Sequence, residues 1–465
     1  MIVSFIICLL IFVAIGVAST IKSKGSSSDY LIANYSIKPW LVGISAAASN
    51  NSGYMFMGMI GYTYSYGLSA IWLMFGWIFG DFIASLLIHK KLRIIAQEKE
   101  VLSFAGVLAK WGDFDYQKLR AYLGIITVIF LGIYAAAQLN AGSKALSTLL
   151  GWDYKVGAII GAIIVLLYCF AGGIRASIWT DAAQAIVMMV AMGLLAMTAI
   201  GESGGVAGFS GQLSNVSTSY TNFFPQDLAI KSFFGPLLFV IGWVVVGFGV
   251  AGQPHIMVRF MAMDNPKNLN IVRSYYYGFY LIFFVFTILV GLAARILLPD
   301  IANFDAELAL PTLAQSILPE VLVGVILAGI FAATMSTADS QVLNCTAAIT
   351  RDLRSKKPSY LMTKLATVLV TATALIIALY GPKSVFALVI IAWSFLAVSF
   401  LPLFLILAFG GRPSEKTSLT VALSGIIVML IWQYFGLHIH ISEIAPGVVA
   451  ALLIYKICSK FMTKS

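Results

Sequence analysis

Apolar runs of about 20 residues recur from one end of this 465-residue chain to the other, the length a helix needs to cross a bilayer. Only 10% of the residues are charged, whereas soluble domains carry about 25%. A water-soluble core cannot bury that much apolar surface at this length. The pattern predicts an all-α polytopic membrane protein, and it excludes a soluble enzyme, a disordered chain and a secreted disulfide scaffold.

Thirteen transmembrane helices fit these runs, which lack the period-2 alternation of a membrane barrel. They are expected at 2–21, 39–62, 68–89, 121–149, 155–172, 177–200, 232–253, 273–298, 317–346, 360–380, 384–408, 418–437 and 444–459.

The basic residues orient the helices, because Lys and Arg are enriched in cytoplasmic loops. With the N-terminus outside, 24 of the 29 Lys and Arg residues fall on the cytoplasmic side, and the C-terminus is cytoplasmic too. The net charge of +10 is therefore explained by the orientation of the helices in a lipid bilayer, which is the expected partner. We therefore expect no nucleic-acid partner, and no obligate protein partner is evident.

Two of the predicted helices are interrupted by residues that a helix in lipid does not tolerate. Five of the nine residues at 46–54 are polar or Gly, and 247–254 holds three glycines and a proline. Paired interruptions at matching positions indicate a substrate site between two inverted repeats. The alternative is that each is a small-residue packing seam.

The interruptions divide the chain into five parts. These are an extra N-terminal helix and loop (1–38), a first repeat of helices 2–6 (39–200), an external loop (201–231), a second repeat of helices 7–11 (232–408) and two C-terminal helices (409–465).

The helix at 317–346 carries hydroxyl groups on one face. Ala333, Ser336 and Thr337 are spaced i, i+3 and i+4, and Asp339 and Ser340 continue that face. With carbonyls freed by the break at 46–54, they would form a cage of neutral oxygens for a small monovalent cation. The alternative is that the hydroxyls bond back to their own helix.

Three carboxylates lie inside predicted spans, at Asp81, Asp181 and Asp339, and an ionisable residue at membrane depth is a functional candidate. Asp181 is either an N-terminal capping residue or a cation ligand facing Asp339. The role of Asp81 stays open. The four His residues are placed in loops or at helix ends, with no proton relay assigned to them.

Several motifs, in order along the chain, resemble the sodium:solute symporter family, and most closely its sodium/proline branch. They are Trp179-Thr180-Asp181-Ala182-Ala183-Gln184, Gly252-Gln253-Pro254-His255-Ile256, Arg259-Phe260-Met261-Ala262, and Met335-Ser336-Thr337 with Asp339-Ser340-Gln341. The resemblance implies a leucine-transporter-like five-helix inverted repeat, alternating access, Na+ as the coupling ion and a bacterial inner membrane.

The resemblance also implies ion ligands. A sodium ion would be held by the carbonyls of Ala48, Asn51 and Ala333 and by the hydroxyls of Ser336 and Thr337. In some members a further sodium is held by residues matching Asp181, Ser336 and Ser340, and Asp339 would add a second acid there.

Four positions depart from the proline branch. Asn50 stands where that branch has Asp, Tyr35 where it has Arg, and Val246 and Val250 where it has Trp and Tyr. The sugar-transporting branch also has Asn at the first position, so sodium coupling does not require the acid. In the proline branch these aromatic side chains help to shape the proline pocket. This chain lacks them, so its solute can differ from proline.

The two breaks and one neighbouring helix are expected to line the solute pocket. The candidates are Asn50, Ser52, Gly53, Tyr54, Gln138, Trp243, Val246, Val250, Gln253 and Pro254.

The predicted protein is a sodium-coupled secondary active symporter that imports proline, a related amino acid or another small organic acid or nutrient. It is not an enzyme, because no nucleophile and base lie together. The competing interpretations are a sensor that keeps a transporter fold without transport, and a channel.

Overall fold

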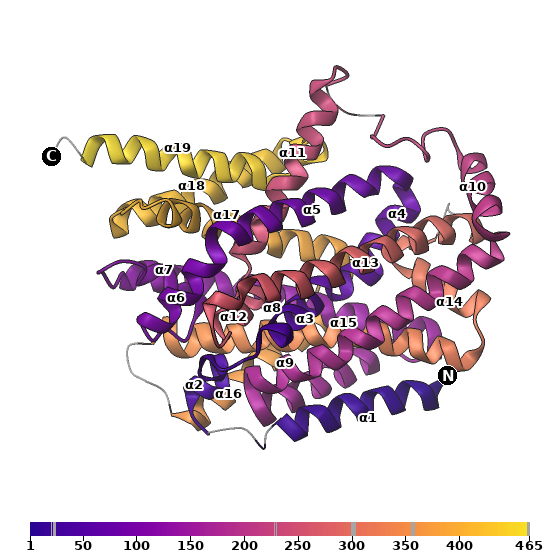
Figure 1. Ribbon diagram of the computed structural model, residues 1–465, viewed down its shortest axis with the longest axis horizontal. Helices are drawn as coiled ribbons and strands as arrows, with labels where there is room; N and C mark the ends of the chain where they lie inside the picture. The colour runs from indigo at the N-terminus through magenta and orange to yellow at the C-terminus, as the bar shows by residue number, and fades with distance from the viewer. Residues whose placement is uncertain are drawn as a thin grey trace.

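The computed structural model describes residues 1–19, 21, 25–226, 228, 230–298, 304–354 and 359–462. Long helices dominate it, and most run roughly parallel to one another across the view of Figure 1. They are α1 (Ile2–Ser19), α3 (Pro39–Gly53), α5 (Ala70–Ala84), α8 (Gln117–Leu150), α9 (Tyr154–Glu202), α11 (Phe234–Phe248), α13 (Leu269–Leu297), α15 (Glu320–Ala347), α16 (Tyr360–Tyr380), α17 (Val385–Ala408), α18 (Glu415–Tyr434) and α19 (Ile444–Met462).

Short helical segments extend or connect them. They are α2 (Ser27–Ile32), η2 (Ala33–Tyr35), η3 (Tyr54–Met59), α4 (Ile60–Tyr66), η4 (Gly67–Ser69), η5 (Ser85–His89), α6 (Lys90–Glu98), α7 (Phe104–Ala109), α10 (Gly205–Val216), η6 (Gly249–Gly252), α12 (Pro254–Met261), η7 (Pro266–Asn268), η8 (Ala306–Leu308), α14 (Ala309–Ile317), η9 (Ala348–Asp352) and η10 (Leu437–Ile439). The predicted loops at 90–120 and 201–231 therefore contain the short helices α6, α7 and α10.

Ten helical stretches of the described chain are long and apolar enough to cross a membrane. One of them, Pro39–Glu98, turns back at Gly67 (φ 69°) and so holds two of the predicted crossings. The first half of α9 is a shorter apolar helix, Tyr154–Leu167, which joins the second half through a bend at Gly173 (φ 58°). With α19, these segments account for the thirteen predicted helices, and the all-α polytopic fold class is confirmed.

The centre of the bundle is formed by α3 and α15. In α15, 83% of the most apolar stretch is buried, compared with 22% in α1, which lies at the edge (Figure 1). Helix α15 packs against α8, α9 and α3. The core therefore surrounds the two segments that carry the predicted cation ligands.

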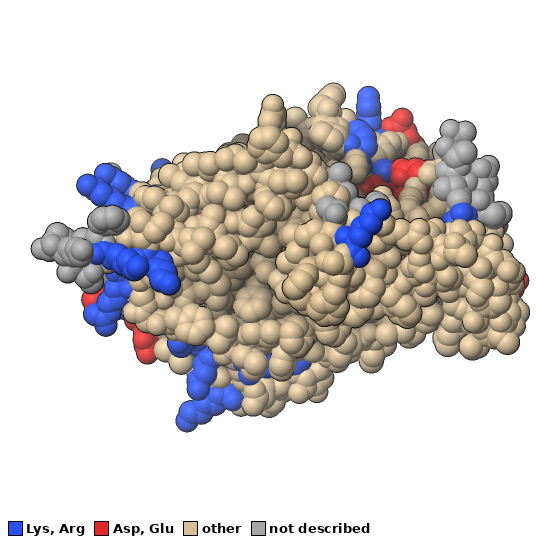
Figure 2. Space-filling model, turned by 90° about the horizontal axis from the view of Figure 1, so that it is seen from above, with Lys and Arg blue, Asp and Glu red and all other residues tan. Residues whose placement is uncertain are grey.

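The two chain termini lie at opposite ends of the bundle (Figure 1). Figure 2 shows several Lys and Arg side chains, with fewer acidic groups among them, at the end where the C-terminus lies, and both kinds of charge at the other end. An odd number of crossings likewise predicts that the two termini lie at opposite ends.

The helix expected at 232–253 matches the apolar stretch Phe234–Gly252, and a further helix, α12, follows directly after its Gly- and Pro-rich segment. The end of α12 is tied to the start of α3 by Ile37 N–H, which donates to the Ala262 carbonyl at 3.1 Å. The second break thus lies between two helices, α11 and α12, and the residues of α12, Arg259 among them, are buried instead of lying in a loop.

Candidate functional site

The first predicted break is present at the end of α3. Ser52 has φ 50° and ψ 177°, a conformation that costs roughly 1–3 kcal/mol for a residue with a side chain. The freed N–H of Gly53 donates to Oε1 of Gln138 in α8 at 2.8 Å, and Tyr134 donates to Oγ of Ser52 at 3.3 Å. Helix α8 therefore satisfies the backbone that the break exposes, as irregular structure at membrane depth requires.

The second break separates α11 from α12. A short 3-10 turn, η6, leads to Gln253 in an extended conformation (φ −98°, ψ 103°), and Pro254 opens α12. Proline suits that first position because its missing N–H would have no partner there. The amide of Gln253 donates to the carbonyl of Trp393 in α17 at 3.1 Å, so α17 anchors this break.

A line of buried aromatic rings connects the two breaks. Tyr54 stacks on Trp77 of α5 and on Phe386 of α17, with ring centroids 5.8 and 5.5 Å apart. Trp77 meets Trp393 at 4.4 Å, and the indole N–H of Trp393 points at the Val246 carbonyl at 3.5 Å. The pocket has no aromatic residue at Val246 and Val250, but Trp77 of α5 and Phe386 and Trp393 of α17 place aromatic rings next to it.

Most of the predicted solute residues lie around this line, and all but one are buried. The buried ones are Asn50, Ser52, Gly53, Tyr54, Gln138, Val246, Val250, Gln253 and Pro254. Trp243 is half-buried and packs against Gly76 of α5. The amide of Asn50 donates to the hydroxyl of Tyr276 in α13, so its contact is with that helix.

Sequence reasoning did not find Trp77, Trp393, Phe386 or Tyr134. They stand in ordinary apolar helices, where aromatic residues are common, and no local feature of the sequence marks them.

The hydroxyl face of α15 meets the unwound end of α3. The hydroxyl of Ser336 lies 3.3 Å from the Ala48 carbonyl, and that of Thr337 lies 3.0 Å from the Ser49 carbonyl. Both hydroxyls also reach the Ala333 carbonyl of their own helix at 3.1 Å. The hydroxyls therefore bond back to their own helix and also contact the carbonyls of α3, so both arrangements considered from the sequence are present together.

Four of the five predicted sodium ligands come together in this way. Asn51, the fifth, is fully buried, and its carbonyl accepts the N–H of Tyr54. Its side-chain amide has no hydrogen-bond partner among the described residues. These oxygens are neutral, which suits a small hard monovalent cation. A divalent ion would need more carboxylate ligands.

A charged cluster lies next to these oxygens. Nη2 of Arg259 lies 2.9 Å from Oδ2 of Asp181, and both side chains are fully buried. Ser45 also donates to that oxygen, at 2.6 Å. The same guanidinium bonds to the hydroxyls of Ser177, at 3.0 Å, and Ser340.

The second acid of the cluster is Asp339. Its Oδ1 accepts hydrogen bonds from Ser177 at 3.0 Å and from Ser340 at 2.9 Å, while Oδ2 has no partner among the described residues. The cluster thus holds two acids and one base, and one carboxylate oxygen of Asp339 stays open among the described residues.

This cluster corrects two expectations. Asp181 is not a capping residue, because it lies about two turns beyond the Gly173 bend, inside α9. Arg259 is not in a cytoplasmic loop. His89 and His255 stand at helix ends as expected, at the end of η5 and the start of α12, but both are buried.

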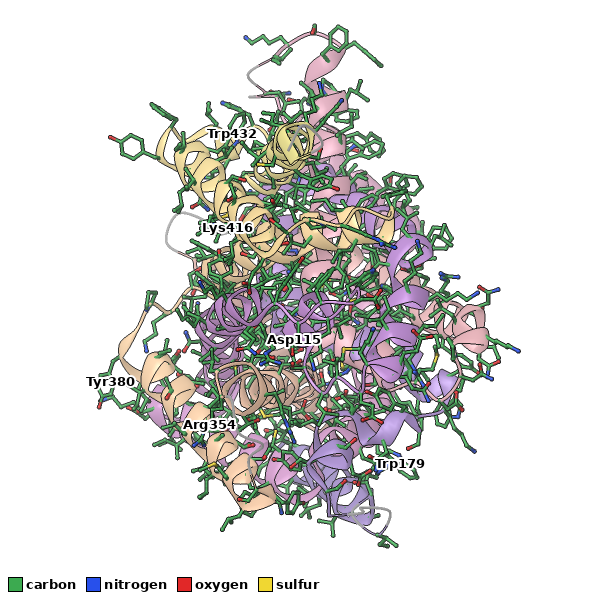
Figure 3. All side chains as sticks on the ribbon, turned by 90° about the vertical axis from the view of Figure 1, so that its left-hand side faces the viewer. Asp115, Trp179, Arg354, Tyr380, Lys416 and Trp432 are labelled. Atoms are coloured by element: carbon green, nitrogen blue, oxygen red, sulfur yellow. The ribbon has the colours of Figure 1, made fainter. Side chains whose placement is uncertain are left out.

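A cavity of about 940 Å³ lies at the end of the molecule that holds the C-terminus. Figure 3 looks onto this end and shows Asp115 near its middle, with Arg354 on the same side. Asp115 pairs with Lys110 and Arg120 at 3.5 and 3.6 Å. Ser103, which caps α7, also lines the cavity and donates to Asp352 at the end of η9, at 2.5 Å.

Tyr35 also lines this cavity, at the position where the proline branch has Arg. Its hydroxyl donates to the carbonyls of Ala96 and Val101 at 2.7 and 3.1 Å. Burial raises the pKa of Tyr35 to about 12, so the hydroxyl stays protonated and keeps donating. Tyr35 thus ties η2 to the end of α6.

Two broken helices that face each other across a packed core define a membrane transporter with a leucine-transporter-like fold. The fold agrees with two solved structures. One is a Na+-coupled sialic acid symporter in a substrate-bound outward-open state, with a TM-score of 0.83 at 17% identity, covering 99% of this chain and 97% of that one. The other is Mhp1, a nucleobase-cation-symport-1 transporter, with a TM-score of 0.58 at 13% identity, covering 94% and 96%.

The chain belongs to the sodium:solute symporter family, whose match spans residues 30–428. It is 28% identical to the high-affinity proline transporter PutP of Bacillus subtilis (strain 168), over 93% of this chain and 92% of the relative. It is also 28% identical to the sodium/proline symporter of Staphylococcus aureus (strain JH9), over 98% and 91%. Membership makes the protein a multi-pass transporter of a small solute with Na+ as coupling ion, not an enzyme.

Proposed function

We propose that this protein imports proline or a related amino acid together with sodium, by alternating access. The observation that carries the proposal is the meeting of the Ser336 and Thr337 hydroxyls with the carbonyls of Ala48 and Ser49. A sodium ion placed among these oxygens would hold α15 against the broken end of α3. The solute site starts one turn further along, at Ser52 and Gly53.

Sodium binding and solute binding are therefore linked through a single element, α3. Solute at the break contacts the same helix whose carbonyls hold the ion, so each ligand stabilises the arrangement that the other needs. One sodium charge crossing 100 mV releases about 2.3 kcal/mol, which supports roughly a fortyfold solute gradient.

The proline relatives, at 28% identity, support an amino acid as solute. The pocket differs from that of the proline branch, since valines replace two aromatics, while Trp77, Trp393 and Phe386 enclose Tyr54 from other helices. A small organic solute with a carboxylate suits the exposed N–H groups at the start of the half-helices.

A second sodium at Asp181, Asp339 and Ser340 belongs to the same proposal. Arg259 already pairs with Asp181, so an ion can enter only when the guanidinium moves away. Asp339 would then supply the additional charge, because its Oδ2 is unpaired among the described residues.

The proposal places the protein in a bacterial inner membrane with its N-terminus outside and its C-terminus in the cytoplasm. The basic end of the bundle in Figure 2 supports this orientation. The domain boundaries proposed above, 39–200 and 232–408 for the two repeats, follow from the breaks in α3 and after α11.

Uptake of radiolabelled proline, other amino acids and small organic acids into proteoliposomes tests the function. An inward sodium gradient should drive accumulation of one of these solutes, and an equal potassium gradient should not. Binding of solute without accumulation would instead support a sensor. Single-channel currents would support a channel.

A further inference from the structure

Asp81 is a buried carboxylate that the sodium and solute sites do not use. It lies in α5, is fully buried, and forms no ion pair among the described residues. Neither of its oxygens has a hydrogen-bond partner of good geometry in the described part of the chain. An unpaired carboxylate is among the costliest groups to keep ionised in a low-dielectric interior.

The helices packed around α5 supply no positive charge that faces this carboxylate. Gly80 lies so close to Val244 and Phe248 that α11 covers this side of α5, and α11 and η6 contain no titratable residue. Helix α4 and η4 adjoin the start of α5, away from Asp81.

On the remaining side, α13 turns hydroxyl groups to Asp81. The phenols of Tyr276, Tyr277 and Tyr280 face it, and those of Tyr276 and Tyr277 approach closely enough to interact. Arg273, the nearest basic residue on α13, is bonded to Ser85, with its Nη2 donating to the Ser85 carbonyl at 2.7 Å. Asp81 is thus surrounded by neutral groups.

Tyr276 connects Asp81 to the solute-binding break. The amide of Asn50 donates to the Tyr276 hydroxyl at 2.5 Å, so the phenol oxygen accepts there and its own proton is free to point at Asp81. Asn50 lies two residues before Ser52, where α3 unwinds. A change in the charge of Asp81 therefore alters a hydrogen bond that ends beside the break.

A buried polar stripe leads from Asp81 toward the basic end of the molecule. Ser85 and His89 follow at i+4 and i+8, and both are buried, whereas Phe82 and Leu86 on the other face are 39% and 52% exposed. Both ring nitrogens of His89 lack a partner in the described chain. At the end of the stripe, Lys90 is exposed.

We propose that Asp81 is a proton-binding site, and that its proton is exchanged as the break in α3 changes conformation. The carboxylate gains one O–H bond and loses one negative charge, and the proton is taken from water at the basic end and returned to it. A metal ion does not fit here, because a hard cation needs several oxygen ligands and only two phenols adjoin the carboxylate. The link to solute rests on the proposed function.

Infrared difference spectroscopy of the full-length protein in lipid nanodiscs tests proton binding without any solute. The wild-type protein should show the carbonyl band of a protonated carboxyl group, and the band should change when sodium replaces potassium. Asp81→Asn should remove the band, and Asp113→Asn, at a fully exposed cytoplasmic position, should leave it intact. Persistence of the whole band in Asp81→Asn would overturn the proposal.

A second variant tests the connection to α3 and needs no change at the acid. Tyr276→Phe should keep the carboxyl band and abolish its response to sodium, because the hydroxyl that joins Asp81 to Asn50 is gone. An unchanged sodium response in Tyr276→Phe would contradict the coupling.

The transport assay separates this proposal from the proposed function. If no tested solute accumulates in wild-type proteoliposomes while the Asp81 band is present and responds to sodium, the solute assignment fails and the proton site stands. If wild-type uptake is driven by sodium but no Asp81 band exists, the proton site fails alone.

Discussion

The Arg259 guanidinium lies 2.9 Å from a carboxylate oxygen of Asp181, and both side chains are fully buried between α12, α9 and α3. Two charges taken out of water stabilise each other only while both are present. Arg259 belongs to the half-helix that follows the second break, and Asp181 to the helix beside the sodium oxygens. Movement of α12 would therefore change the charge next to the ion site.

Removing one partner of this pair is expected to destabilise the protein strongly. Arg259→Gln or Asp181→Asn alone should lower the free energy of unfolding by about 3–5 kcal/mol, since each leaves a buried charge unpaired. The double variant should lose less than the two single effects added together. Unfolding of all four proteins in one detergent measures this cycle, and strict additivity would show that the two side chains do not interact.

Loss of the α15 hydroxyls is expected to weaken sodium binding. Ser336→Ala or Thr337→Ala should raise the sodium concentration for half-maximal uptake about tenfold or more, because a bond to a charged group contributes about 1.5–3 kcal/mol. Thr373→Ala is the matched control, since among the described residues that exposed hydroxyl donates to the Leu369 carbonyl of its own helix. An unchanged sodium response in both site variants would remove them as ligands.

A methyl group at the first break should obstruct the solute site. In Gly53→Ala the new Cβ would lie 2.8 Å from Ala141, 2.9 Å from Thr334 and 3.0 Å from Oε1 of Gln138. Displacing Gln138 frees the Gly53 N–H, so we expect solute uptake to fall at least tenfold with the protein still inserted. Gly278→Ala, where no atom lies within 4 Å, should transport normally.

Gln138 itself is expected to matter as an acceptor rather than as a packing group. Gln138→Leu leaves the buried N–H of Gly53 without its partner, at a cost of about 1–3 kcal/mol. Gln138→Glu retains an acceptor oxygen and should recover part of the lost stability. Thermal unfolding of the two variants compares them directly, and equal losses would show that the Gly53 contact contributes nothing.

Much of the site could be predicted because its signals are local. Glycine and proline after 246 and polar residues at 46–54 mark where a helix cannot continue, and both breaks lie there. The i, i+3, i+4 spacing of Ala333, Ser336 and Thr337 places them on one helical face through helical periodicity alone. The resemblance then names α3 as the helix that this face meets.

The errors lie where a signal depends on packing between helices. A Gly- and Pro-rich stretch is typical both of the end of a helix and of a break, and nothing in it marks the buried helix α12 that holds Arg259 beyond the break. Trp393 and Trp77 resemble ordinary apolar residues, because only the approach of α17 to α5 brings their rings together.

The amino-acid sequence by itself determined that this protein is a bundle of membrane-spanning helices, where those helices break, and which face of α15 carries hydroxyls. These properties follow from hydrophobic length and helical periodicity, which act within one segment. Only the tertiary structure decided that Arg259 pairs with Asp181, that Gln138 caps the break at Gly53, and that Asp81 stands among phenols. Such contacts join residues far apart in the chain, and they depend on how whole helices pack against one another, which no single segment determines.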